Sequence, residues 1–390
     1  MTRYMSSKAL TVVVNSMMIA TAALAAVLTG IVGYGRPQGA GHVSLYDYEY
    51  FFYEAGRKWL VGLNPYDDFF PYPPNSSLLL MILSGTDLET SKGLFLILNG
   101  GCIIVFVYLC LRLYHLTREN NPFLLLDFKS SLLAAMIIGN AAVANVLWGG
   151  QTSILFSTAL LASYYFYIRS QDIWSGLFLA LALIKPQLAY TFLLWLILEK
   201  KWKLLSVSVI GTVLLGIVPI YHRGPMTAVL DWVNVLNHYL QGEYETFWNL
   251  FGLKPLLQDM GIYISGRITV IISLLSVVLI HRYGLGNDKA KLLGILAIIG
   301  LLLGQAHQYD LVIAVSILPY YFQRVDISRD SLKSLVWICL VFVIVNFPRK
   351  LLLLSDLRLL HHHREIVFLI LLFFLLAGGR KETGRPVVEA

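Results

Sequence analysis

The chain has few charged residues. Of its 390 residues, 14% are Asp, Glu, Lys or Arg and 57% are hydrophobic, whereas soluble domains carry roughly 25% charged residues. The mean hydropathy is +0.68. This composition excludes an ordinary soluble domain and indicates a protein that crosses a membrane several times. No region departs from it, so residues 1–390 are treated as a single domain.

Motifs for nucleotides and metals are also missing. The sequence has no P-loop, no dinucleotide fingerprint, no GxSxG and no zinc-protease helix, which argues against nucleotide-driven chemistry. Cys102, Cys110 and Cys339 have no metal-type spacing, and three consecutive histidines at 361–363 cannot all face one ion. We therefore expect no metal and no cofactor. The net charge of +7 fits basic loops facing anionic lipid and does not indicate nucleic acid as a partner.

Apolar runs recur along the whole chain and predict an all-α polytopic membrane protein, with a bundle of about twelve transmembrane helices. The first run, Ala9–Gly33, is longer than the core of a cleaved signal peptide and should remain as a helix. The other runs are 93–115, 131–148, 152–169, 172–184, 187–199, 203–221, 267–283, 289–304, 310–323, 332–347 and 364–378.

Two of these runs, 172–184 and 187–199, are too short to cross a membrane upright. They meet at the sequence IKPQ, where Pro186 lacks an amide donor. The pattern favours a tilted or broken pair of helices, and a single kinked helix remains open.

Positive charge predicts the orientation of the bundle. Threading twelve passes places most basic loops and both termini on the cytoplasmic side of the cell membrane. The exception is the last external loop, which carries Arg349, Lys350, Arg358 and Arg364. The same threading sends five polar segments to the external face and predicts a site there. These segments are 34–75, 148–151, 185–187, 222–266 and 304–310.

The first external segment has a helical pattern from Asp47 to Leu63. Phe52, Ala55, Gly56, Trp59 and Leu63 form one stripe, and Asp47, Glu54 and Lys58 form another. We expect an amphipathic helix on the membrane surface that presents a carboxylate. Asp47 is the first candidate, ahead of Glu49, Asp67 and Asp68. An interfacial anchor with aromatic belt residues, and a simple helix cap at Asp47, are the alternative interpretations.

Other polar residues reach the same face. Lys185 lies in an apolar stretch, where its ammonium can meet a phosphate, although a lysine that extends to the interface is the alternative. His307 lies at the outer end of another apolar run and is a candidate to bind phosphate or orient a base. Gln151 follows two glycines that permit close backbone approach, and Asn249 lies in the sequence FWNLFG. Tyr72, which precedes a proline, is included among the predicted substrate-binding residues.

Six sequence segments occur in an order that resembles a known family. They are "D…YEAGRKWLVGLNPYD", "YPPNSSLLL", "GQTSILFSTALLA", "LALALIKPQLA", an Asn in a late external loop and "AHQYDL". The order resembles the GT-C membrane glycosyltransferases of family 87, the polyprenyl-phosphate-mannose-dependent mannosyltransferases. The resemblance covers about residues 40–320.

The resemblance implies roles for particular residues. It assigns the catalytic base to Asp47, the basic residue of the KP motif to Lys185 and the histidine of the late helix end to His307. The spacing from Asp47 to the EAG sequence is about one residue longer than in the family, so Glu49 stays open as the base. The implied reaction is inverting transfer of a sugar, mannose first, from polyprenyl phosphate to a hydroxyl of a glycolipid or glycan.

The chemistry of such a transfer agrees with these residues. A donor that arrives in the membrane needs a groove between helices, hydrogen-bonding or cationic groups for its phosphate, and one base. The expected partners are this donor, the acceptor and membrane lipids. The alternative is a transporter or flippase of a lipid-linked saccharide, which predicts repeated halves and gates on both faces. Neither feature is evident in the sequence.

Overall fold

Helices form almost all of the ordered structure in the computed structural model, which describes residues 7–34, 45–68, 70–117, 127–240, 250–304, 306–327, 330–352 and 357–377. The only β-structure within these ranges is one antiparallel pair of two-residue strands, β1 (Leu250–Phe251) and β2 (Ala306–His307). The predicted all-α class is confirmed.

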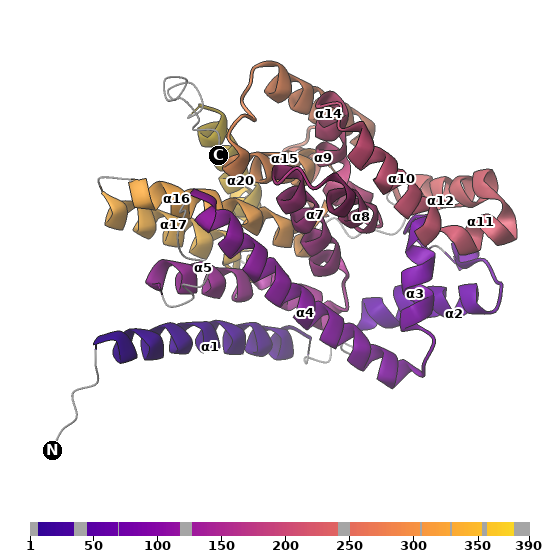
Figure 1. Ribbon diagram of the computed structural model, residues 1–390, viewed down its shortest axis with the longest axis horizontal. Helices are drawn as coiled ribbons and strands as arrows, with labels where there is room; N and C mark the ends of the chain where they lie inside the picture. The colour runs from indigo at the N-terminus through magenta and orange to yellow at the C-terminus, as the bar shows by residue number, and fades with distance from the viewer. Residues whose placement is uncertain are drawn as a thin grey trace.

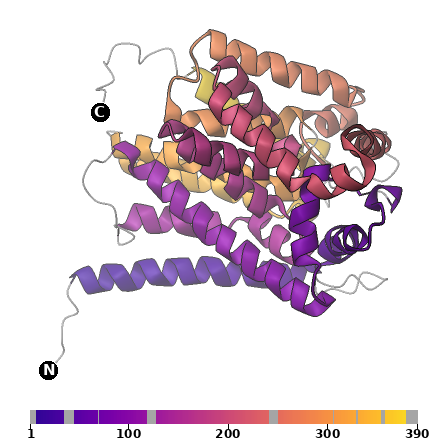
Figure 2. The ribbon, with the colours of Figure 1, turned by 45° about the vertical axis from the view of Figure 1, so that its right-hand side comes forward.

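The chain begins with α1 (Ser7–Tyr34), which runs along the outer edge of the bundle beside α5 (Figures 1 and 2). The first-loop elements follow: the π-helix η1 (Tyr48–Tyr53), α2 (Glu54–Leu60), the 3₁₀ turns η2 (Pro65–Asp68) and η3 (Pro74–Ser76), and α3 (Ser77–Leu83).

The remaining helices, in chain order, are α4 (Leu88–Tyr114), η4 (His115–Thr117), α5 (Phe128–Ile138), α6 (Ala141–Gly149), α7 (Ser153–Ile168), α8 (Asp172–Ala182), α9 (Pro186–Leu198), α10 (Trp202–Leu215), α11 (Ile217–Arg223), α12 (Pro225–Leu240), α13 (Leu253–Asp259), α14 (Gly266–Arg282), α15 (Lys289–Leu303), η6 (Gln308–Ile317), α16 (Leu318–Ile327), α17 (Ser331–Asn346), α18 (Arg349–Leu352), α19 (Arg358–His361) and α20 (His363–Ala377).

Judged by helix length, the structure has fewer candidate membrane-spanning helices than the sequence has apolar runs. Among the described residues, two helices are long and apolar enough to cross a membrane, the segment Thr11–Leu28 of α1 and the whole of α4. The pairs α5–α6 and α10–α11, bent by 42° and 61°, bring the number to four if each pair is one span. Several other apolar helices are shorter. The apolar helices indicate a membrane protein, and the bundle of about twelve helices stays a prediction.

The centre of the bundle is built around α7 and α15, whose residues are buried on nearly every side. Small residues permit close contact between neighbouring helices. Ser163 of α7 and Ser175 of α8 each donate a hydroxyl hydrogen bond to the other's carbonyl at 2.8 Å. A Cβ at Gly176 would lie 2.6 Å from the Leu204 carbonyl oxygen of α10. Such small residues are common where membrane helices pack.

The first-loop elements form a second core at one end of the molecule with α11 and α12 (Figures 1 and 2). The predicted stripe of Phe52, Ala55, Gly56 and Trp59 is buried. It packs against protein, since a Cβ at Gly56 would meet the Leu80 carbonyl of α3 at 2.5 Å. Leu63 is 58% exposed, so its assignment to the stripe was wrong: α2 ends at Leu60 and the chain turns before reaching it.

The break predicted at IKPQ is confirmed. The α8 helix ends at Ala182, and α9 begins at Pro186, which is its first helical residue. Lys185 has non-helical dihedrals (φ −120°, ψ 74°), as expected for a residue before proline. The segment therefore forms two short helices, and the break directs Lys185 into the bundle.

Candidate active site

The WGGQ segment at the C-terminal end of α6 lies directly against the start of the first-loop helix. Gly150 has φ +75°, and a Cβ there would lie 2.7 Å from the Tyr48 Cβ. The Leu45 amide donates to the Trp148 carbonyl oxygen at 2.8 Å. This close approach, predicted from the glycines, brings Gln151 to the first loop, where its side-chain amide donates a hydrogen bond to the Asp47 carboxylate.

A buried ion pair lies at the centre of the same region. Lys185 Nζ lies 2.5 Å from Asp310 Oδ1, and the two side chains are 1% and 0% exposed. Ser153, the first residue of α7, completes a triangle: its hydroxyl accepts from Lys185 at 2.6 Å and donates to Asp310 Oδ1 at 2.7 Å. A buried pair of this kind is stable only when further hydrogen bonds satisfy both charges, and the Ser153 hydroxyl supplies one to each.

His307 is fixed from two directions. Its backbone amide donates to Asp310 Oδ2 at 3.0 Å. His307 also belongs to β2, where it pairs with Leu250 of β1. Its ring stacks on Tyr309 with centroids 4.9 Å apart, and Lys185 Nζ lies 4.6 Å from the centroid of that Tyr309 ring. Asp310 therefore links the lysine to the backbone that positions His307, whose side chain stays 12% exposed.

Tyr72 connects the ion pair to the first loop. Burial raises the pKa of its phenol, a hydrogen bond with the Thr152 side chain opposes this rise, and the nearby Asp310 and Asp47 carboxylates raise the pKa further. The phenol therefore stays protonated and can donate a hydrogen bond. The Asp47 carboxylate also acts electrostatically on Lys185, so Asp47, Tyr72, Lys185 and Asp310 belong to one cluster.

The rival carboxylates of the first loop point elsewhere. Glu49 Oε2 lies 2.9 Å from Lys92 Nζ at the start of α4. Asp68 pairs with Lys58, and the Asp67 carboxylate accepts from the Asn64 amide at 3.0 Å. These three side chains are held by partners outside the cluster.

The structure thus brings together Asp47, Gln151, Tyr72, Lys185 and His307 of the predicted site residues. Glu49, two positions after Asp47 in the chain, faces α4 instead, where it pairs with Lys92. Asn249 lies outside the described residues. The sequence prediction gave no central role to Asp310 and did not consider Ser153. Both lie in segments that carry the family resemblance, Asp310 in AHQYDL and Ser153 in GQTS. A lysine in an apolar stretch needs a carboxylate partner, and this requirement could have identified Asp310.

The three histidines at 361–363 do not converge on one point. His362 Nε2 lies 3.2 Å from Asp259 Oδ2, whereas His363 Nδ1 faces the Leu360 carbonyl oxygen at 3.1 Å. Within the residues that the structure describes, no three His, Cys, Asp or Glu side chains are grouped so as to hold a metal ion.

An apolar helical chain with a carboxylate beside a buried charged cluster fits an enzyme that works at a membrane. The model of glycosyltransferase family 87 matches residues 69–307, which is more than half of the chain, and the chain therefore belongs to this family and is a glycosyltransferase. The match includes Tyr72, Gln151, Lys185 and His307, and Asp47 lies before it. No curated protein matches the chain.

Proposed function

We propose that the protein transfers a sugar, with mannose as the first candidate, from a polyprenyl-phosphate donor to a hydroxyl of a lipid-linked or glycan acceptor. The transfer inverts the anomeric configuration and uses Asp47 as general base. Membership of family 87 supports glycosyl transfer. The proposed mechanism, with Asp47 as the base, rests mainly on the Asp47–Gln151 hydrogen bond beside the Lys185–Asp310 pair.

The proposed step is a single displacement. The Asp47 carboxylate takes the proton of the acceptor hydroxyl while the hydroxyl oxygen attacks the anomeric carbon, and the bond from that carbon to the phosphate oxygen breaks. The products are the glycoside and polyprenyl phosphate. One base suffices for this step, in contrast to the two carboxylates of most glycoside hydrolases. Asp47 is only partly buried, so an acceptor can reach it, and Gln151 fixes its orientation.

The leaving phosphate needs hydrogen-bond donors. We assign contact with it to His307, which is partly exposed, and to the protonated Tyr72. Lys185 was predicted to meet the phosphate itself, but its ammonium is directed at Asp310, Ser153 and the Tyr309 ring. We therefore propose that Lys185 is a positioning residue, which acts through Asp310 on the backbone of His307.

The proposed location is the external face of the cell membrane. The support is the distribution of positive charge, which threads the basic loops to the cytoplasm and Asp47, Gln151 and His307 to the other side. A membrane-embedded donor also suits a chain with so many apolar helices.

Reconstitution tests the proposal against the flippase alternative. Purified protein in liposomes receives polyprenyl-phosphate mannose, glucose or arabinose and a glycolipid acceptor, and the products are identified by mass spectrometry. The expected result is a new glycoside that Asp47→Asn does not form. Movement of the intact donor between leaflets without any glycoside product would support the flippase instead.

A further inference from the structure

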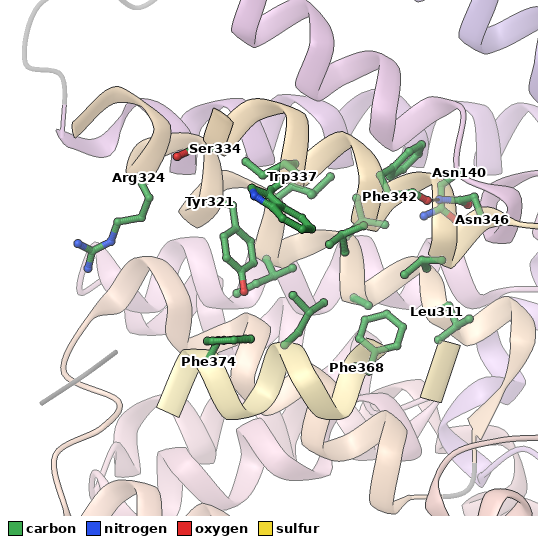
Figure 3. Close-up of a pocket in the computed structure, with 18 residues that line it drawn as sticks. Asn140, Leu311, Tyr321, Arg324, Ser334, Trp337, Phe342, Asn346, Phe368 and Phe374 are labelled. Carbon is green, nitrogen blue, oxygen red and sulfur yellow. Dashed lines mark hydrogen bonds between the residues drawn. The ribbon is translucent and has the colours of Figure 1, made fainter. Parts of the chain in front are cut away.

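The last helix, α20, packs on the short strand pair that carries His307. The Phe368 ring of α20 meets the Phe251 ring of β1 edge to face, with centroids 5.6 Å apart, and Phe251 is 1% exposed. Phe368 also lines an apolar groove between η6, α16, α17 and α20 (Figure 3). The antiparallel register places Phe251 opposite Ala306 and Leu250 opposite His307. The position of β1 on α20 therefore bears directly on the strand of His307.

A buried arginine in the first turn of α20 adds a polar link to the same strand pair. Arg364 is 7% exposed. Its Nη1 donates to Gln308 Oε1 at 2.6 Å, and its Nη2 donates to the Phe347 carbonyl oxygen at 3.2 Å. The Gln308 amide in turn donates to the Leu250 carbonyl oxygen at 3.2 Å, which Arg349 Nη1 approaches at the longer distance of 3.5 Å. Arg364 is thus joined through Gln308 to β1.

The guanidinium of Arg364 determines which way the Gln308 amide faces. A guanidinium has five donors and no acceptor, so only the Oε1 atom of Gln308 can face it. The Nε2 atom then faces away, toward the Leu250 carbonyl oxygen. Without the arginine nothing holds the oxygen on that side, and the amide is free to turn over and lose its bond to Leu250. One charged donor therefore fixes the direction of a neutral hydrogen bond.

His307 is supported on both sides of its backbone by these contacts. Its amide donates to Asp310 Oδ2 at 3.0 Å, and its strand partner Leu250 accepts from Gln308. The partly exposed His307 ring is the group assigned above to the leaving phosphate. Such a group must be placed accurately, because a displacement of about 1 Å can lower a rate by roughly 10²-fold.

We propose that Arg364 is a positioning residue for His307 and acts through Gln308 and the β1–β2 pair. The inference rests on the proposed function, because it concerns the placement of the residue that meets the leaving phosphate. Lys185 and Asp310 hold His307 from one side, and Arg364 and Gln308 hold it from the other.

The proposal gives a reason for two features of Arg364. The predicted threading places this arginine on the external side, against the general trend of positive charge, and burial of a guanidinium is costly without a function or a partner. Arg364 and Gln308 also both follow residue 307, where the match to the family ends. The C-terminal part of the chain therefore contributes to the site.

Chemical labelling of His307 tests the link without any sugar transfer. Diethyl pyrocarbonate modifies accessible imidazoles, and mass spectrometry gives the rate at His307 in the full protein in detergent. Arg364→Met should raise this rate about threefold or more, because the strand pair opens more often. Arg364→Lys, which keeps a charged donor, should recover part of the protection. His281, held by Glu199 on α14, is the internal reference and should react at the same rate in all variants.

Two glutamine variants provide a matched comparison. Gln308→Leu should raise labelling of His307 as Arg364→Met does. Gln323 of α16 is 8% exposed and likewise donates to a backbone carbonyl, that of Leu113 at 2.7 Å, but it has no printed contact with the strand pair. Gln323→Leu should leave labelling of His307 unchanged, which separates positioning from a general loosening of the bundle.

Turnover in a double-variant cycle tests whether Arg364 acts through Gln308. Arg364→Met should lower single-turnover transfer about tenfold or more in the unmodified protein, since His307 is displaced. In the Gln308→Leu background the same change should lower transfer by less than about twofold, because the link is already broken. Equal factors in the two backgrounds would show that Arg364 acts independently of Gln308 and would overturn the proposal.

Unchanged labelling of His307 in Gln308→Leu would also overturn it, and so would an equal rise in Gln323→Leu. These two variants keep Arg364, so they decide against the proposal even if Arg364→Met does not fold. The expected labelling changes in a protein that transfers no sugar would refute the proposed function and keep the link from Arg364 to His307. Sugar transfer without those changes would keep the function and refute the link.

Discussion

The Gln151 side-chain amide donates a hydrogen bond to the Asp47 carboxylate and so joins two segments that lie 104 positions apart in the chain. The contact depends on Gly150, whose backbone lies against Tyr48. It distinguishes Asp47 from the three other candidate carboxylates, Glu49, Asp68 and Asp67, which are held by Lys92, Lys58 and Asn64.

Replacing Gln151 with Glu should shift the pH dependence of transfer. A second carboxylate beside Asp47 disfavours the ionised form of Asp47 and raises its pKa. Because the base must be ionised, activity should be lost at a higher pH as the solution is acidified. Rates measured against pH check this, with Gln151→Ala as the control that removes the hydrogen bond without adding charge. An unchanged acid limb in Gln151→Glu would separate Gln151 from the base.

Gly150→Ala should impair both folding and activity. At φ +75° an added Cβ costs about 1–2 kcal/mol, and it would also press against Tyr48 and displace Gln151 from Asp47. Gly62→Ala is the matched control, since Gly62 has φ +76° but no atom near its added Cβ. We expect a similar backbone penalty and normal turnover there. Equal turnover in the two variants would contradict the role of the close approach.

Lys185→Met should destabilise the protein strongly. It leaves the Asp310 carboxylate buried without its cation, and breaking one side of a buried pair costs about 3–5 kcal/mol. Lys58→Met, which removes a surface pair with Asp68, should change stability by about 1 kcal/mol or less. Denaturant unfolding in detergent measures both. In the double variant Lys185→Met/Asp310→Asn, part of the stability should return because no unpaired charge remains.

Accessibility labelling checks the orientation of the membrane protein. Asp68→Cys, in a background with Cys102, Cys110 and Cys339 replaced, places a thiol on the exposed first loop. An impermeant maleimide should react with it from outside intact cells. Reaction only after the cytoplasmic face is opened would reverse the orientation and move the site to the other side.

The features that depend on local backbone chemistry were predictable from the sequence. Pro186 predicted the break before α9, and the glycines of WGGQ predicted the close approach at Gly150. Helical periodicity identified the buried stripe from Phe52 to Trp59, and it failed at Leu63 because periodicity does not say where a helix ends.

The pairing of distant polar residues was not predictable in the same way. Lys185 and Asp310 are separated by 125 positions, and only the packing of α7, α9 and η6 brings them together. The choice between Asp47 and Glu49 likewise depends on Lys92, which reaches Glu49 from α4. A resemblance to the family supplied the residue types of the site, but the partner of each side chain is set by the tertiary structure.

The most direct test of the account compares Asp47→Asn with Glu49→Gln in a single-turnover assay with polyprenyl-phosphate mannose as donor. Both changes keep the shape of the side chain and remove its basicity. Because a positioned base contributes about 10²–10⁴-fold, transfer by Asp47→Asn should fall by that order while donor binding stays near normal, and Glu49→Gln should lose far less. Full transfer by Asp47→Asn with none by Glu49→Gln would contradict the account and assign the base to Glu49.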